Sequence, residues 1–380
     1  MIRNKMFDFL FLSIFFCFIF EILSPLAWGQ SGEIKGAQYG SPESFAEFHG
    51  FVNLQYYDFD NQLPAGVPSG FDLRDFYLSA RSKIRQNVTV FGEIDAEQGV
   101  FKLDRALIDL QLHPLVNFQF GKFFTPFGID KVESTQAPLN KLSSIPLPLV
   151  ELGYEDWADV GVQMYGEYGM KPVKLGYHLA VLKGPSGFTE TDIRNKENNR
   201  NKFLTARGVI RSPLTGEGRF EAGASAAYGK YDDASQNTIK MIGADGKLLW
   251  SGLEIRGEYM IRQGNDSTAA VSCDGTNIAG PGNCTIARAD ASGYYLQISY
   301  ALLKNIPSVY LLEPVVRIDK SDLADHFAPP DPDTARRRVT VGINYAPYAH
   351  FLLKGEYEFV KNDGTDLHND GVLLSVVTDF

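Results

Sequence analysis

The sequence predicts an all-β protein, a transmembrane antiparallel β-barrel with short periplasmic turns and long outer loops. Three observations predict it: alternation of apolar and polar residues along extended segments, connectors that alternate in length, and a chain end that resembles a final barrel strand. The segments number about 16 and run for about 10 residues each, which suits a membrane barrel better than the shorter strands of soluble sandwiches.

The start of the chain has the features of a secretory signal peptide. A basic beginning is followed by the apolar run Phe9–Phe20 and then by Ala27-Trp28-Gly29, with small residues at positions −3 and −1 of a cleavage site. The apolar run is shorter than the roughly 20 residues that a membrane-spanning helix needs. We therefore expect a signal peptide at 1–29, an N-terminal periplasmic segment at 30–46 and the β-barrel domain at 47–380.

Strand candidates follow from the two-residue periodicity, and the clearest pair lies near the start of the barrel. Apolar and polar residues alternate from Asp75 to Arg85, and the alternation resumes at Val88 after Gln86-Asn87. This pattern predicts strands with one face toward an apolar environment and one toward water. It recurs along the chain and predicts strands at 47–58, 73–85, 88–98, 102–112, 116–124, 158–167, 173–183, 202–211, 219–229, 238–249, 253–263, 291–302, 309–320, 336–346, 350–361 and 370–380.

The connectors between these strands alternate between short and long. Short connectors opposite long ones are typical of bacterial barrels, and an even number of strands places both barrel ends on the periplasmic side. The longest connector, Thr125–Trp157, contains four prolines. Proline stiffens the chain and cannot donate to a strand ladder. The short connectors are predicted near 86–87, 113–115, 168–172, 212–218, 250–252, 303–308 and 347–349.

The last segment of the chain has the pattern of a closing barrel strand. Val372, Leu374, Val376 and Phe380 fall on one face, and Thr378 is the polar member of that face. A final strand that ends in phenylalanine resembles the signal read by the outer-membrane assembly machinery. This agrees with the export signal and with the strand pattern, so three levels of the sequence point to the same fold.

Charge and histidine spacing disfavour two classes of function. The formal net charge is −10, which disfavours nucleic acid as a partner. The six histidines are scattered without metal-ligand spacing, and no G-x-S-x-G segment is present. We therefore expect no enzymatic activity, no metal and no cofactor.

Two cysteines, Cys273 and Cys284, remain after the expected cleavage, and they lie in a segment rich in Gly, Asn and Asp. An exported protein matures in an oxidising compartment, so we expect a disulfide between them. Two free thiols are the alternative, and a metal site made by these two residues alone is less favoured.

Several segments, taken in order, resemble the phosphate-selective porin O and P family. Phe120–Gly128 resembles its G-x-F/Y-x-x-P-F-G segment, and Asp159–Gly166 resembles the strand that follows. Glu313–Asp319 resembles a late E-P-x-x-R-x-D strand, and Val341–Tyr345 with Lys354–Tyr357 resembles the final hairpin. The resemblance covers most of the predicted barrel. It implies 16 strands, a homotrimer and the passage of small anions such as phosphate.

Barrel pattern and resemblance together predict a porin in the outer membrane of a Gram-negative bacterium, open to small hydrophilic solutes. In such a porin, a long loop after the fifth strand folds into the lumen and sets the pore width, so we expect this of Thr125–Trp157, with an ordinary outer loop as the alternative. Its constriction candidates are Lys131, Glu133 and Lys141. A different reading is a barrel that acts in adhesion or structural support through its outer loops.

The alternation of side chains between the two faces of each strand predicts which charged residues line the lumen. Rings of Arg and Lys favour anions. Inward carboxylates such as Glu93 and Asp319 are equally numerous, so a salt bridge within the wall is the alternative role for each arginine. Arg81, Lys83 and Arg85 form the strongest cluster, because they occupy successive inward positions. The full set of pore-lining candidates is Arg81, Lys83, Arg85, Arg105, Arg207, Arg256, Arg317 and Arg338.

A basic triplet, Arg336-Arg337-Arg338, lies at the predicted outer end of a late strand. In the outer leaflet, outer-membrane lipid and lipopolysaccharide present phosphate groups with which such a triplet can pair. A solvated loop end is the alternative reading.

Overall fold

The computed structural model describes residues 46–380 except for eleven stretches within that range, and it does not describe residues 1–45. The predicted signal peptide, the predicted periplasmic segment before residue 46, Lys131, Glu133, Cys273 and Cys284 all lie outside the described residues. The segments left out after residue 45 are 60–68, 98–99, 130–135, 153–156, 185–199, 215, 232–236, 265–289, 307–308, 324–334 and 364–369.

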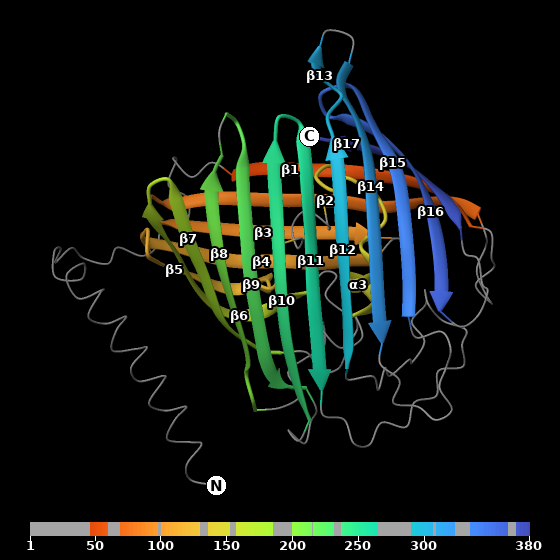
Figure 1. Ribbon diagram of the computed structural model, residues 1–380. Coiled ribbons are helices and arrows are strands. Elements are labelled where there is room, and N and C mark those ends of the chain that lie inside the picture. Colours follow the sequence, from red (N-terminus) through yellow and green to blue (C-terminus); the bar gives the residue numbers. More distant parts are fainter. Residues whose placement is uncertain are drawn as a thin grey trace, which may run out of the picture. The chain divides into compact units, whose positions relative to one another are not determined.

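Sixteen antiparallel strands close into a barrel (Figure 1), which confirms the predicted fold class. Each strand pairs with the next along the wall, and β1 pairs with β17 to close it, with Phe51 opposite Asp379. The wall strands are β1 (Ala46–Phe59), β2 (Ser69–Arg85), β3 (Val88–Glu97), β4 (Val100–His113), β5 (Val116–Phe124), β6 (Ala158–Met170), β7 (Val173–Leu182), β8 (Phe203–Pro213), β9 (Arg219–Lys230), β10 (Thr238–Trp250), β11 (Leu253–Gly264), β12 (Ala291–Tyr300), β14 (Val309–Leu323), β15 (Ala335–Tyr348), β16 (Phe351–Asp363) and β17 (Gly371–Asp379).

One predicted turn contains an additional short strand. Residues 303–308 were predicted as a connector, but β13 (Leu303–Ile306) pairs with the start of β14, with Leu303 opposite Leu312. This hairpin extends past Tyr300, the last residue of β12, and projects beyond the wall in Figure 1. The prediction of a plain turn was wrong because a two-stranded extension needs no alternating buried face, so the periodicity gives no sign of it.

In the barrel wall the apolar side chains are exposed and many polar ones are buried, the reverse of a soluble protein, as β15 illustrates. Val339, Val341 and Ile343 are 40%, 46% and 48% exposed, whereas Arg338 and Thr340, on either side of Val339, are buried. Successive side chains of a strand point to opposite faces, so the exposed apolar residues face outward and the buried polar residues face inward. This arrangement is typical of barrels that cross a membrane. Among the described residues, no helix is long and apolar enough to span one.

The largest apolar cluster lies inside the barrel, where the segment between β5 and β6 meets the wall. Trp157 and Phe203 pack edge to face, with ring centroids 5.5 Å apart. A second, smaller cluster joins Phe51 and Tyr77, whose rings stack at 4.7 Å, to Ala137 of the same segment. The large cluster comprises Leu107, Phe123, Phe127, Leu149, Leu152, Trp157, Ala180, Leu182, Phe203, Ala227, Tyr231, Ile239, Met241, Met260 and Ala291.

The inverted pattern predicts how the wall responds to charge. Val341→Arg places a cation on the outward face near the middle of β15 and is expected to lower the free energy of folding into phospholipid vesicles by about 2–4 kcal/mol. Tyr345→Arg, on the same face near the strand end, is expected to cost about 1 kcal/mol or less. Urea titrations of the vesicle-folded protein measure both values. Equal losses at the two positions would contradict the assignment of an outward apolar face.

Candidate pore constriction

The segment from Thr125 to Trp157 runs through the barrel interior. Its ends meet at the rim, where the Thr125 amide donates to the Trp157 carbonyl oxygen at 2.9 Å. Between them, its one described helix, α3 (Leu147–Glu151), packs against β12 and β14 (Figure 1). Since β5 and β6 lie across the barrel from β14, this segment, hereafter the inner loop, crosses the lumen.

Buried cations of the wall hold the inner loop by its main chain. Backbone carbonyl oxygens are present whatever the loop sequence, so this anchorage depends on wall residues rather than on loop side chains. Four cations donate to such oxygens: Arg262 to Leu152 (2.6 Å), Arg317 to Ser144 (2.7 Å), Arg338 to Ile145, and Lys354 to Ala137 (2.6 Å) and Asn140 (2.8 Å).

Wall carboxylates accept hydrogen bonds from the same loop. Glu356 accepts from the Ser144 amide at 2.8 Å and from its hydroxyl at 3.2 Å. Asp319 accepts from the Leu147 amide at 3.1 Å, which caps the start of α3. The wall therefore supplies both donors and acceptors to the loop, so that main-chain carbonyl and amide groups both find partners.

A compact network of charges lies beneath the middle of the loop, on β14, β15 and β16. Arg338 donates from Nε to Asp319 at 3.1 Å and from Nη1 to Glu358 at 3.0 Å. Arg317 Nε lies 3.1 Å from the other Asp319 oxygen. All four side chains are buried, and two cations face two anions, so the burial of charge is compensated within the network.

The end of α3 is tied down by a separate pair. Arg336 Nη1 donates to Glu151 Oε1 at 2.9 Å, and the Ser321 hydroxyl donates to the other oxygen of that carboxyl. Burial raises the pKa of the Glu151 carboxyl, although the neighbouring Arg336 opposes this. Arg336 therefore faces the barrel interior rather than the outside.

The one predicted constriction residue that the structure describes is Lys141. Its Nζ lies 2.8 Å from Glu313 Oε1 and 3.8 Å from Glu254 Oε2. Asn344 donates to the Lys141 carbonyl oxygen at 3.0 Å. Lys141 therefore fastens the loop to β14 and β11, and its charge is balanced by two wall carboxylates.

Three of the predicted lining arginines lie on other parts of the wall, and each has a carboxylate partner. Arg105 donates to Glu93 at 2.8 Å, and its guanidinium carbon lies 4.6 Å from the ring centroids of Phe91 and Phe124. Arg207 donates to Asp245 at 2.8 Å and to Glu221 at 3.5 Å, and Arg256 lies 3.8 Å from Glu254. With Arg317 and Arg338, five of the eight predicted lining cations are thus in ion pairs.

The predicted cluster Arg81, Lys83 and Arg85 differs from these five. All three side chains are exposed. Arg81 and Lys83 share a face of β2 with Tyr77, whose hydroxyl accepts from Gln136 of the inner loop at 2.8 Å, so this face points inward. A register shift separates Lys83 from Arg85, which pairs with Val88, so the alternation does not place Arg85 on the same face. No ion pair joins them to another residue in the described parts of the chain. They lie beside the turn to β3, at the end of the barrel with short connectors.

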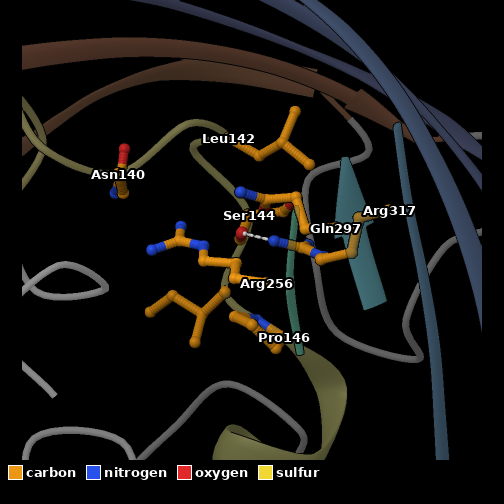
Figure 2. A pocket seen from close by; sticks show the side chains of 8 residues that line it. Asn140, Leu142, Ser144, Pro146, Arg256, Gln297 and Arg317 are labelled. Carbon is orange, nitrogen blue, oxygen red and sulfur yellow. Dashed lines mark hydrogen bonds between the residues drawn. The ribbon is translucent and has the colours of Figure 1, made fainter. Parts of the chain in front are cut away.

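A small pocket separates the inner loop from the wall (Figure 2). Figure 2 shows Arg317 reaching toward Ser144 across it, while Arg256 lies on the opposite side. The space between the loop and the wall measures about 180 Å³ when the solvent onto which it opens is included. It is lined by Asn140, Leu142, Ser144, Ile145, Pro146, Arg256, Gln297 and Arg317. Within the described residues, no group of three possible metal ligands occurs.

Sequence reasoning did not single out several residues that hold the loop. Lys354, Glu356 and Asn344 fall on inward positions of β16 and β15, but nothing in their spacing indicates a loop contact. The only available signal was the alternation of inward and outward positions along each strand, together with the length of the inner loop. That alternation identifies candidate residues on every strand. The partner of each side chain depends on the path of the loop.

Comparisons with known proteins bear on the fold. No family model matches the chain, and no curated protein matches it in sequence. Among solved structures, the outer membrane channel DcaP of Acinetobacter baumannii shares 14% identity and a TM-score of 0.59, covering 91% of this chain and 100% of its own.

Two further structures show the same likeness. The anion-selective porin from Comamonas acidovorans shares 11% identity and a TM-score of 0.60, covering 89% of this chain and 100% of its own. OmpT of Vibrio cholerae, an outer membrane protein solved in a trimer form, shares 11% identity and a TM-score of 0.55, covering 89% and 99%. At these identities the likeness establishes the fold: the chain has the barrel fold of outer-membrane channel proteins.

The buried network predicts an asymmetry between two adjacent arginines. Arg338→Ala removes a cation that pairs with the buried carboxylates of Asp319 and Glu358. The substitution is expected to destabilise the folded barrel by about 3–5 kcal/mol. Arg337→Ala, at the next residue and exposed, is expected to change stability by about 0.5 kcal/mol or less. Urea-induced unfolding of both purified variants measures the difference. Similar midpoints for the two would contradict the network.

Proposed function

We propose that this protein is a porin of the Gram-negative outer membrane, through which small hydrophilic solutes diffuse passively. The observation that carries the proposal is that the inner loop is held mainly on one side of the lumen. Most of the hydrogen bonds from the wall to the inner loop come from strands β11 to β17, whereas some inward side chains on other strands, such as Lys83 of β2 and Gln111 of β4, are exposed to solvent. A polar passage beside the loop accounts for this exposure.

The inner loop sets the width of this passage in our proposal. Its main chain is held at five or more points by buried wall residues, so it stays in the lumen as a fixed partition. Selectivity by size then follows from the space between the loop and the wall strands that it does not touch. The barrel fold shared with solved outer-membrane channels supports the same role.

Deleting residues 137–146 should widen the passage, because this segment supplies most of the anchored part of the loop. We expect single-channel conductance in planar bilayers to rise at least about twofold. A heat-dependent shift in electrophoretic mobility confirms that the variant still forms a barrel. Closure in steps of three would support the homotrimer that we propose from the family resemblance and from the trimer form of OmpT. A folded wild-type protein that passes no current would overturn the porin proposal and favour adhesion or support.

Charge selectivity is proposed to favour anions, phosphate among them. Arg105, Arg207 and Arg256 are balanced by neighbouring carboxylates, so they add little net potential. Arg81 and Lys83 present two exposed cations on one inward face, and the exposed Arg85 lies next to them at the turn. Uncompensated Arg and Lys in a lumen attract anions. Two lines of support are the resemblance to phosphate-selective porins and the fold shared with an anion-selective porin.

Reversing two of these charges tests the selectivity. Arg81→Glu combined with Lys83→Glu should lower the anion-to-cation permeability ratio several-fold, read as a shift of the reversal potential in a salt gradient. As a matched control, Lys202→Glu with Lys240→Glu makes the same change of net charge on other exposed residues and should leave the reversal potential unchanged. A reversal potential that stays constant in the Arg81 and Lys83 variant removes this cluster as the selectivity site.

A further inference from the structure

An aromatic ring at the start of the inner loop is packed against a distant part of the wall. Phe127 lies three residues after Phe124, the last residue of β5, yet its ring lies over Gly243 of β10, five strands further along the wall. Only 1% of Phe127 is exposed. A residue so close to β5 that packs on β10 lies inside the lumen, in front of strands β6 to β9.

The wall has a hollow that fits this ring. A Cβ atom added at Gly243 would stand 3.1 Å from two carbon atoms of the Phe127 ring, which is closer than an ordinary contact. Other inward residues of the same apolar cluster are also small, namely Ala180 of β7 and Ala227 of β9. The missing side chains leave space that the ring occupies, and packing at this density leaves no room for water.

The residue after Phe127 keeps the ring in place. Gly128 has a φ of +72°, a left-handed conformation that favours glycine, and a Cβ atom there would collide with the Glu258 carboxylate of β11. The Gly128 amide donates to the Ser225 hydroxyl of β9 at 3.0 Å. The chain therefore turns directly after the ring, and the ring cannot withdraw from the wall without loss of this hydrogen bond.

The two sides of the lumen differ in their access to water. A barrel of about 16–18 strands holds an aqueous channel unless its interior is filled. Near Phe127 it is filled by Trp157, Leu182 of β7 and Phe203 of β8, each 2% exposed or less. On the inward faces of β1 and β2, by contrast, His49 and Arg81 are exposed. Water and polar solutes therefore have access beside β1 and β2.

We infer that Phe127 is a specificity-determining residue of the pore, because its ring closes the part of the lumen in front of β6 to β9. Polar solutes are thereby directed to the side of β1 and β2, past the exposed cations Arg81 and Lys83. A second route behind the loop would bypass these cations and the width set by the loop. The inference rests on the proposed porin function and adds the residue that confines solutes to one side of the lumen.

Phe127→Ser tests the inference in planar bilayers. A purely apolar cavity can stay dry, so the substitution places a hydroxyl in the vacated space to admit water. We expect single-channel conductance to rise about 1.5-fold, and vesicles that contain the variant to admit sugars that the wild-type pore excludes. As a matched control, Phe220→Ser makes the same change on the outer face of β9 and should conduct like the wild type. A heat-dependent shift in electrophoretic mobility confirms that each variant forms a barrel.

A second substitution separates closure of the lumen from simple anchoring of the loop. Gly243→Leu, added to Phe127→Ser, extends an apolar side chain from the wall into the vacated space, because a Cβ atom at Gly243 points at the position of the lost ring. Conductance should then return to the wild-type value, although the loop still lacks its aromatic anchor. If Phe127→Ser does not fold, the milder Phe127→Leu takes its place in the same comparison.

The outcomes separate this inference from the porin proposal. Unchanged conductance in the Phe127 variant, an equal rise in Phe220→Ser, or a failure of Gly243→Leu to restore the wild-type value overturns the inference. A conducting wild type in any of these cases leaves the porin proposal standing. A wild type that passes no current rejects the porin proposal. In that case a current through the Phe127 variant still supports closure by the ring, and no current through it overturns the inference as well.

Discussion

The contact between buried wall charges and the main chain of the inner loop is the interaction on which the interior of this barrel depends. Arg317, Arg338 and Lys354 each donate to loop carbonyl oxygens, and Asp319 and Glu356 accept from loop amides. A segment that crosses a lumen has no strand ladder to satisfy its polar groups. Wall side chains do so here, and this keeps the loop in one place.

Charge pairing organises the rest of the lumen. Arginines such as Arg105 and Arg207 face carboxylates on neighbouring strands, which rigidifies the wall and cancels most of their field. The exposed cations of β2 stand apart from this pattern. The structure therefore separates two uses of the same residue types, because a cation inside an ion pair positions the chain, whereas an exposed cation remains available to solutes.

The outward face follows a different physical rule. Its apolar residues are exposed because this face of a membrane barrel is turned toward lipid, and closure leaves no unpaired strand edge. Polar side chains on that face are confined to the strand ends. Arg337 near the start of β15, directly opposite Lys320 of β14 and Lys361 of β16, is one such case.

The sequence by itself determined the sixteen strands of the wall, because a two-residue period is a local property that sterics translate directly into faces. It also placed Arg81, Lys83, Arg105 and Arg338 at inward positions by parity. Only the tertiary structure decided which of them are paired. Arg105 meets Glu93 on the adjacent strand, but Lys354 meets Ala137 from a loop more than two hundred positions earlier in the chain. The two-residue alternation was enough to divide Arg336, Arg337 and Arg338 between the two faces of the wall. The alignment of Arg337 with Lys320 and Lys361 required the register of three neighbouring strands. That register depends on closure of the whole barrel.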